Sequence, residues 1–465
     1  MNFSTPWKYV YFVGIGGIGM SALARWFHVN GFLVAGYDRT PTPLTDTLQA
    51  EGIQVCFDDN LNSIPTDFLK DSLLTLVVYT PAIPADHRQL VYFRETKFEI
   101  QKRSQVLGWL TNTLKTVAVA GTHGKTTTSS MVAHLFRAAG QNCTAFLGGI
   151  TQNYGTNFLL NDPTENVEEI LCVVEADEFD RSFLTLFPSV AIVTSTDADH
   201  LDIYGEHESL MESFRSFVSQ IRSDGMLFMR KGLELKDSTS ANVVEYSLHE
   251  GDVHCTNLQI KDARFMFDVV HPEGEISGFS LSVPGFHNVE NALAAIAVAL
   301  YVGLSPEQIR AGINTYKGVQ RRFEYIIESE TAVFIDDYAH HPTEIEAFLS
   351  SVRALYPTRH ITAVFQPHLF SRTRDFAEGF ANSLSLADRL LLLDIYPARE
   401  LPIPGVTSRI IFDKVKLEDK TQISADQLIS VLKMKEIDVL VTIGAGDISK
   451  YVGYIKEMLQ VPFAN

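Results

Sequence analysis

Short apolar runs rich in valine and isoleucine recur along this chain and alternate with segments of helical periodicity. The runs lie at residues 9–13, 73–79, 117–120, 170–175, 190–194, 333–336, 361–365, 390–393 and 439–443. Strands that are apolar throughout are typical of parallel sheets covered by helices on both faces. The pattern therefore predicts an α/β fold built on parallel sheets.

The alternating pattern restarts twice, which predicts three domains. A length of 465 residues agrees with about three domains. We expect boundaries that give domains of residues 1–112, 113–319 and 320–465. Between about residues 222 and 284 the strands become short and are separated by glycine and aspartate turns, which predicts an antiparallel elaboration of the middle domain.

A glycine-lysine-threonine turn follows the strand at residues 117–120. Its residues are Gly121, Thr122, His123, Gly124, Lys125, Thr126 and Thr127. The glycines allow close approach of a phosphate, the following helix supplies positive potential, and Lys125 reaches the terminal phosphates of ATP while Thr126 holds Mg²⁺. The loop is shortened, because Val119 stands where the first glycine of a phosphate loop is expected. A plain turn is the alternative, and the amphipathic run after Thr128 argues against it.

An earlier glycine loop follows the strand at residues 9–13. The glycines Gly14, Gly16, Gly17 and Gly19 fit a GxGxxG pattern, and Asp38 ends the next apolar strand. Such a loop binds a diphosphate and leaves three readings open: a dinucleotide, a UDP-sugar, or a purely structural turn. A second nucleotide loop in the same chain favours the UDP-sugar.

Charge and cysteine content exclude several classes of protein. The chain has 56 acidic and 38 basic residues and a net charge of −18, which argues against nucleic-acid and anionic-membrane partners. Its four cysteines form no CxxC pair, so we expect reduced thiols and no zinc site. With no signal-peptide pattern and no apolar run that spans a bilayer, we expect a cytoplasmic protein without membrane insertion.

Acidic residues follow two of the predicted strands. Glu175 ends the strand at residues 170–175 and is a candidate Mg²⁺ ligand together with Thr126. Asp177, Asp180 and Asp199 are equally well explained as helix caps.

Several motifs in a fixed order make the chain resemble the ATP-dependent Mur ligases of bacterial cell-wall synthesis. They are residues 121–128, Glu175, residues 197–200, 287–291, 321–324 and 336–343. Residues 366–376 and 396–405 narrow the resemblance to the alanine-adding member of the family. It implies an N-terminal Rossmann-like UDP-sugar-binding domain, a central P-loop ATPase-like domain, and a C-terminal Rossmann-like domain that contributes to the ATP and amino-acid sites.

The resemblance also implies roles for individual residues. Catalysis would use Lys125, Glu175, His200 and Arg322, and metal binding would use Thr126, Glu175 and His200. His200 has a second interpretation, a hydrogen bond to a neighbouring carboxylate, because imidazole is not the preferred ligand of Mg²⁺. ATP would contact the loop residues Gly121 to Thr127 together with His287, Asn291, Arg322 and Asp337, the UDP-sugar would contact Gly14, Gly16, Gly17, Gly19 and Asp38, and the amino acid would contact Tyr338, His340, Arg372 and Arg374.

The reaction implied joins L-alanine to UDP-N-acetylmuramate with ATP and two Mg²⁺ ions, for which Mn²⁺ is a substitute, in a monomer or homodimer. The chain has no lysine between Lys125 and Lys231, so the carbamoylated lysine of later Mur ligases has no counterpart. Three alternatives stay open: a recycling ligase that attaches a preformed peptide to the same sugar, a Rossmann oxidoreductase, and a nucleotide switch without catalysis.

Overall fold

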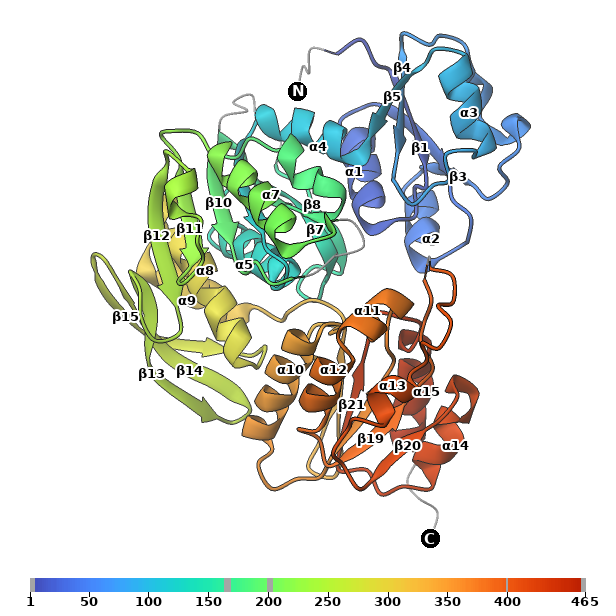
Figure 1. The fold of residues 1–465 in the computed structure, drawn as a ribbon. Coiled ribbons are helices and arrows are strands. Elements are labelled where there is room, and N and C mark those ends of the chain that lie inside the picture. Colours follow the sequence, from blue (N-terminus) through green and yellow to red (C-terminus); the bar gives the residue numbers. More distant parts are fainter. Residues whose placement is uncertain (1–4, 163–168, 199–203, 399, 461–465) are drawn as a thin grey trace. The chain divides into compact units, whose positions relative to one another are not determined.

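The computed structural model describes residues 5–162, 169–198, 204–398 and 400–460. Within these residues the fold is α/β and has N-terminal, central and C-terminal parts, each built around its own sheet (Figure 1). The chain divides into two compact units. The first comprises residues up to His254 with Val270–Glu275 and Asn291–Ile313, and the second comprises Cys255–Val269, Ile276–Glu290 and Asn314–Asn465.

The N-terminal part is a parallel five-stranded sheet with the order β3-β2-β1-β4-β5. Apolar side chains point alternately to its two faces. Val10 and Phe12 pack in one core with α1, and Tyr11 and Val13 pack in another with Phe93 of α3. The elements are β1 (Tyr9–Val13), α1 (Ile18–Val29), β2 (Leu33–Tyr37), α2 (Pro43–Ala50), β3 (Gln54–Cys56), β4 (Thr75–Tyr79), α3 (Arg88–Glu95), β5 (Glu99–Lys102) and α4 (Arg103–Asn112).

The central part contains a larger sheet whose described strands follow the order β15-β14-β13-β12-β11-β10-β6-β9-β7-β8. Strand β6, which leads into the second glycine loop, and β9, which ends at Glu175, lie side by side and parallel. The elements are β6 (Lys115–Ala120), α5 (Lys125–Ala138), β7 (Cys143–Thr151), β8 (Thr156–Leu159), β9 (Leu171–Glu175), β10 (Val190–Val193), α7 (His207–Ser219), β11 (Met226–Arg230), β12 (Asn242–Ser247), β13 (Val253–Lys261), β14 (Arg264–His271), β15 (Gly274–Leu281), α8 (Phe286–Val302) and α9 (Pro306–Thr315).

The antiparallel elaboration expected from residue 222 starts later than predicted. Strand β11 pairs parallel with β10, and β12 pairs parallel with β11. The helix α7 and the 3₁₀ turn Lys236–Ser238 provide crossovers between these strands, and such connections allow parallel pairing. Strands β13, β14 and β15 follow one another through turns of two residues. The first of these turns has positive φ at Asp262 and Ala263, as a two-residue antiparallel hairpin requires.

The C-terminal part has a six-stranded sheet of order β16-β17-β21-β18-β19-β20. All its pairs are parallel except β16 with β17. The elements are β16 (Glu324–Glu328), β17 (Val333–Asp337), α10 (Pro342–Leu355), β18 (Ile361–Phe365), α11 (Phe370–Asp375), α12 (Ala377–Leu384), β19 (Arg389–Leu392), α13 (Arg409–Phe412), β20 (Lys420–Gln422), α14 (Leu428–Lys433), β21 (Val439–Ile443) and α15 (Ser449–Gln460).

One apolar core runs through the N-terminal and central parts of the first unit. It includes Trp26 and Phe27 of α1 together with Phe146 of β7 and Phe183. Arg25 adds a polar link, because its guanidinium donates to Glu51 at 2.7 Å and to Asn157 of β8 at 3.1 Å. This shared core holds the two glycine loops of the unit in a defined relation. Among the described residues, no helix is both long and apolar enough to cross a membrane.

Candidate active site

The second glycine loop joins β6 to α5, and backbone geometry explains its glycines. Gly124 is the N-cap of α5 at φ +82°, and Gly121 has φ +136°. A Cβ atom at Gly121 would lie 2.1 Å from Oγ1 of Thr194, and one at Gly124 would lie 2.7 Å from Oδ1 of Asn291. Both positions therefore need glycine for conformation and for space, and the loop leaves the N-terminus of α5 open to an anion.

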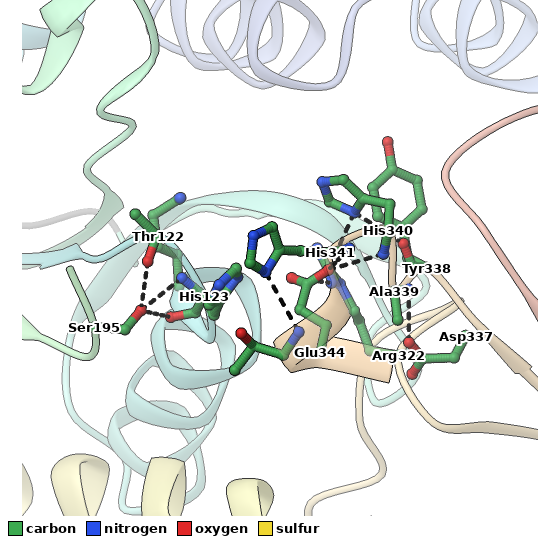
Figure 2. Close-up of polar contacts among 12 residues, drawn as sticks. Thr122, His123, Ser195, Arg322, Asp337, Tyr338, Ala339, His340, His341 and Glu344 are labelled. Carbon is green, nitrogen blue, oxygen red and sulfur yellow. Dashed lines mark hydrogen bonds and ion pairs between the residues drawn. The ribbon is translucent and has the colours of Figure 1, made fainter. Parts of the chain in front are cut away.

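Hydrogen bonds connect this loop to the segment after β10. The Thr122 hydroxyl lies 2.9 Å from the Ser195 hydroxyl, and the His123 amide donates to the same Ser195 oxygen at 2.8 Å (Figure 2). The Asp197 amide donates to Thr122 Oγ1 at 3.0 Å, and His123 Nε2 lies 3.3 Å from an Asp197 carboxylate oxygen. These hydrogen bonds fix the loop at Thr122 and His123 against the segment after β10.

Lys125 forms a buried ion pair that the sequence did not suggest. Its ammonium donates to Glu178 Oε2 at 2.7 Å, to Glu178 Oε1 at 3.0 Å and to the Gly121 carbonyl at 2.7 Å. The Glu178 side chain is fully buried. Burial alone lowers the pKa of Lys125, but the carboxylates of Glu178, Asp177 and Glu175 outweigh it and raise the pKa. Lys125 therefore stays charged at the loop.

A cavity of about 340 Å³ in the first unit is lined by the first glycine loop and by the acids at the end of β9. One wall comes from the start of α1 and α4, including Gly17, Gly19 and Arg103, and the opposite residues come from β7 and the end of β9, including Glu175 and Asp177. The Glu175 carboxylate is packed against Gly148, where a Cβ atom would lie 2.3 Å from Oε2. The cavity therefore joins the first glycine loop to the acids beside the phosphate loop.

In the first glycine loop, Asp38 supports the backbone. Its carboxylate accepts a hydrogen bond from the Gly16 amide at 2.7 Å, and a Cβ atom at Gly16 would lie 2.8 Å from the same oxygen. Gly14 has φ +92°. The N-cap of α1, Gly17, has no side-chain cap, and the first turn of α1 has no acidic residue. The helix N-terminus faces the cavity with uncompensated amides.

The oxygen donors near the phosphate loop fit a hard divalent cation. Thr126 lies in the first turn of α5, and Glu175 and Asp177 line the cavity. Hydroxyl and carboxylate oxygens are the ligands that Mg²⁺ prefers. No cluster of three histidine, cysteine, aspartate or glutamate side chains suited to a metal occurs among the described residues. The third predicted metal ligand, His200, lies outside the described residues.

In the second unit, Asp337 ends β17 and organises the turn before β16. Its two oxygens accept hydrogen bonds of 2.7 Å from the amides of Phe323 and Ala339. Phe323 has φ +47°, a conformation that these bonds stabilise. Burial raises the pKa of Asp337 to about 6, although the Arg322 charge and the two amide donors oppose the shift.

An aromatic and cationic cluster surrounds Tyr338, also in the second unit. The guanidinium of Arg322 lies 4.9 Å from the Tyr338 ring centre, and the His340 ring lies 5.4 Å from it (Figure 2). The ring centres of His340 and His368 are 6.2 Å apart. The His368 ring stacks on the Tyr396 ring, with 5.9 Å between their centres. His368 and Tyr396 lie in the motif segments 366–376 and 396–405, but the sequence alone does not show which rings meet.

The two predicted arginines of the amino-acid pocket lie in different environments. Arg372 is buried in α11, and its Nη1 lies 3.4 Å from Nδ1 of His368. Arg374 instead makes two hydrogen bonds with Asp375, at 2.7 and 3.1 Å, and 55% of its side chain is exposed. The structure therefore brings Arg372 to the aromatic cluster and does not bring Arg374 there.

Two of the residues predicted to contact ATP, His287 and Asn291, lie at the start of α8 and belong to different units. Asn291 in the first unit lies beside the N-cap glycine of α5. His287, in the second unit, is the second residue of the helix. Burial lowers the pKa of His287 to about 4, and its Nδ1 has no hydrogen-bond partner within the described chain.

Comparisons with known proteins agree with this architecture. Three family models match in order: "Mur ligase family, catalytic domain" at residues 9–114, "Mur ligase middle domain" at 119–299, and "Mur ligase, glutamate ligase domain" at 321–446. The UDP-N-acetylmuramate–L-alanine ligase of Phocaeicola vulgatus is 51% identical over 455 residues, which cover 97% of this chain and 98% of the relative. The corresponding ligase of Porphyromonas gingivalis is 49% identical over 458 residues, covering 97% and 99%.

Solved structures give the same result. The UDP-N-acetylmuramate-alanine ligase MurC of Thermotoga maritima has a TM-score of 0.81 and 28% identity, and the match covers 97% of this chain and 99% of that one. The murein peptide ligase of Psychrobacter arcticus has a TM-score of 0.69 at 23% identity, covering 97% and 98%, and shares the fold. With three family models in order along nearly the whole length, the chain belongs to the Mur ligase family.

Proposed function

We propose that this ligase joins L-alanine to the lactyl carboxylate of UDP-N-acetylmuramate, with conversion of ATP to ADP and phosphate. The observation that carries the proposal is the cavity of the first unit, which has a diphosphate-type glycine loop on one wall and the acids Glu175 and Asp177 on another. A UDP-sugar acid has the matching chemistry, a diphosphate at one end and a carboxylate at the other. The names of the relatives above point to the same substrates.

A carboxylate does not react directly with an amine, because its oxygen is a poor leaving group, and ATP must first activate it. A carboxylate oxygen attacks the γ-phosphorus of ATP, and the bond between this phosphorus and the β-γ bridging oxygen breaks. The products of this step are an acyl phosphate and ADP. The alanine amine then attacks the acyl carbon, loses a proton, and expels phosphate to form the amide. The start of α5 and the Lys125 ammonium would bind the phosphoryl oxygens whose charge increases during the first step.

Thr126, Glu175 and Asp177 are the described residues that would hold Mg²⁺, with His200 as the expected additional ligand. When bound, the ion neutralises charge on the transferring phosphoryl group. Asp337, Arg322, His287 and Asn291 remain our candidates for contacts with ATP.

For L-alanine we propose contacts in the second unit, with Arg372 as the carboxylate-binding residue. A guanidinium offers paired N–H donors to a carboxylate, and Arg372 is buried next to the His368 and Tyr396 rings. The exposed Arg374, already paired with Asp375, is the weaker candidate.

A coupled assay tests the proposed function. Wild-type protein is incubated with UDP-N-acetylmuramate, ATP, Mg²⁺ and L-alanine, and ADP, phosphate and the new amide are measured, the last by mass spectrometry. We expect all three products in equal amounts and none when any one substrate is omitted. ATP hydrolysis without amide, or no turnover at all, would contradict the proposal.

Two further arms of the assay address the alternatives. Replacing L-alanine by the tripeptide tests the recycling ligase, which would use the peptide and ignore the free amino acid. NADH binding in place of UDP-sugar binding would indicate an oxidoreductase. ATP binding without phosphate release in the complete mixture would indicate a nucleotide switch.

A further inference from the structure

The guanidinium of Arg103 lies directly over the first glycine loop. Arg103 begins α4, and a Cβ atom on Gly19 would lie 2.7 Å from its Nη1. Both residues line the cavity described above. Because glycine at this position has no side chain, the guanidinium can approach the first turn of α1 closely.

No side chain of the described chain forms a hydrogen bond or an ion pair with this cation. Most arginines in the described part of the same unit have a hydrogen bond or an ion pair, as Arg25 has with Glu51. Arg103 has neither within the described chain. Glu175 and Asp177 line the same cavity and yet form no ion pair with Arg103. The cation therefore faces the cavity with its donors unused.

The position of Arg103 is electrostatically unusual. A helix N-terminus carries a partial positive charge, which favours acids there and disfavours cations. At α1 the first turn has no acid and no side-chain cap, and Arg103 adds a full positive charge beside it. Two positive groups side by side are favourable when an anion lies between them.

The proposed substrate needs such a group. A diphosphate carries about two negative charges at neutral pH, and the chain has a net charge of −18. The residues that the motif suggested for the UDP-sugar are four glycines and Asp38, and none of them is a cation. Among the residues that line the cavity, Arg103 is the basic one.

We propose that Arg103 is a substrate-binding residue that holds the diphosphate of the UDP-sugar against the N-terminus of α1. The inference rests on the proposed function for the identity of the ligand. The planar guanidinium offers two parallel donors to phosphate oxygens, whereas the loop amides offer single ones. Arg103 thus supplies the charge that the glycine loop lacks.

The test compares ligands with and without phosphates. Calorimetric affinities of UDP-N-acetylmuramate, UDP and uridine are measured for the wild type, Arg103→Met and Arg103→Lys. Methionine keeps much of the apolar stem and removes the charge. We expect Arg103→Met to weaken the binding of UDP-N-acetylmuramate and UDP by on the order of 10- to 100-fold and to leave the affinity for uridine unchanged. The affinities of Arg103→Lys for the two diphosphates should lie between those of the wild type and Arg103→Met, because lysine keeps the positive charge and loses the two parallel donors of the guanidinium.

Arg88→Met is the matched control, since Arg88 lies on α3 of the same N-terminal part and 72% of its side chain is exposed. It should bind all three ligands as the wild type does. Binding of an ATP analogue at the other loop checks that each variant is folded. Wild-type affinity of Arg103→Met for UDP, or an equal loss for uridine, would overturn the proposal.

The outcome separates this inference from the proposed function. If the wild type binds UDP with the Arg103 dependence described and forms no amide, the ligase proposal fails and the role of Arg103 stands. If amide forms and Arg103→Met binds UDP normally, the role of Arg103 fails and the ligase proposal stands.

Discussion

Lys125 and Glu178 act as one unit, which matters for any test of the phosphate loop. The ammonium makes three hydrogen bonds, and its carboxylate partner is fully buried. Removing one member of a buried pair leaves an uncompensated charge and costs about 3–5 kcal/mol. The simple variant Lys125→Ala therefore mixes loss of stability with loss of catalysis.

We predict that the double variant Lys125→Met with Glu178→Gln separates the two effects. Lys125→Ala alone should lower the free energy of unfolding by about 3 kcal/mol and turnover by orders of magnitude. The double variant should regain most of the stability, because no buried charge is left, and none of the turnover. Urea denaturation and the coupled assay measure the two quantities. Recovery of turnover in the double variant would remove Lys125 from the chemistry.

Arg372 allows a second prediction about a single side chain. If it binds the alanine carboxylate, Arg372→Lys should raise the KM for L-alanine at least tenfold and leave the KM for ATP nearly unchanged, since the paired donors are lost. Arg409→Lys is the control, because Arg409 lies on α13 of the same unit and 60% of its side chain is exposed. An unchanged dependence on alanine concentration in Arg372→Lys would exclude the role.

At the scale of elements, α5 has a left-handed glycine at both ends. Gly124 at the N-cap has φ +82° and lies close to Asn291, whereas Gly140 beyond the C-terminus has φ +75° and open space around its Cα. A side chain at either position is strained by about 1–2 kcal/mol. Only Gly124 carries the additional constraint of close contact and lies at the end that would receive phosphate.

We predict that Gly124→Ala and Gly140→Ala both lower the melting temperature, Gly124→Ala by more because of its close contact with Asn291, and that they differ in function. Gly124→Ala should weaken binding of an ATP analogue at least tenfold, because a Cβ atom there would displace Asn291 and obstruct the loop. Gly140→Ala should bind the analogue like the wild type. Calorimetry gives both readouts, and equal affinities would show that the loop tolerates a side chain.

For the whole molecule, buried histidines link folding to pH. His134 on α5 is buried, bonds to the Tyr154 hydroxyl at 2.9 Å, and has its pKa lowered to about 4 by burial, against a smaller opposing effect of the Gly312 backbone. The unfolded chain takes up this proton near pH 6.5, and the folded chain takes it up near pH 4. Stability from His134 is therefore complete above about pH 6.5 and is lost as the pH falls toward 4.

The shift corresponds to about 3 kcal/mol of stability lost between pH 6.5 and 4. We predict that His134→Gln, which keeps a hydrogen bond to Tyr154, reduces the pH dependence of the free energy of unfolding in this window by about that amount. His249→Gln, at an exposed position, should leave it unchanged. Urea denaturation at several pH values provides the measurement, and parallel curves for all three proteins would contradict the assignment.

The sequence by itself determined the α/β class and the positions of the glycine loops. These features depend on local physics: apolar strands need burial on both faces, and glycine is required where φ is positive, as at Gly14, Gly121 and Gly124. The same local signals located Lys125 and Glu175, because Lys125 follows the glycine loop after β6 and Glu175 ends β9. The roles proposed for these residues still await the experiments above.

Only the tertiary structure decided which side chains meet. Lys125 pairs with Glu178 and Arg103 lies over Gly19, although nothing in the sequence pattern distinguishes these partners from their neighbours. Likewise β11 and β12 continue the parallel sheet, because their connections are long enough to cross over. Contacts between residues far apart in sequence depend on packing and charge in three dimensions, which local patterns do not encode.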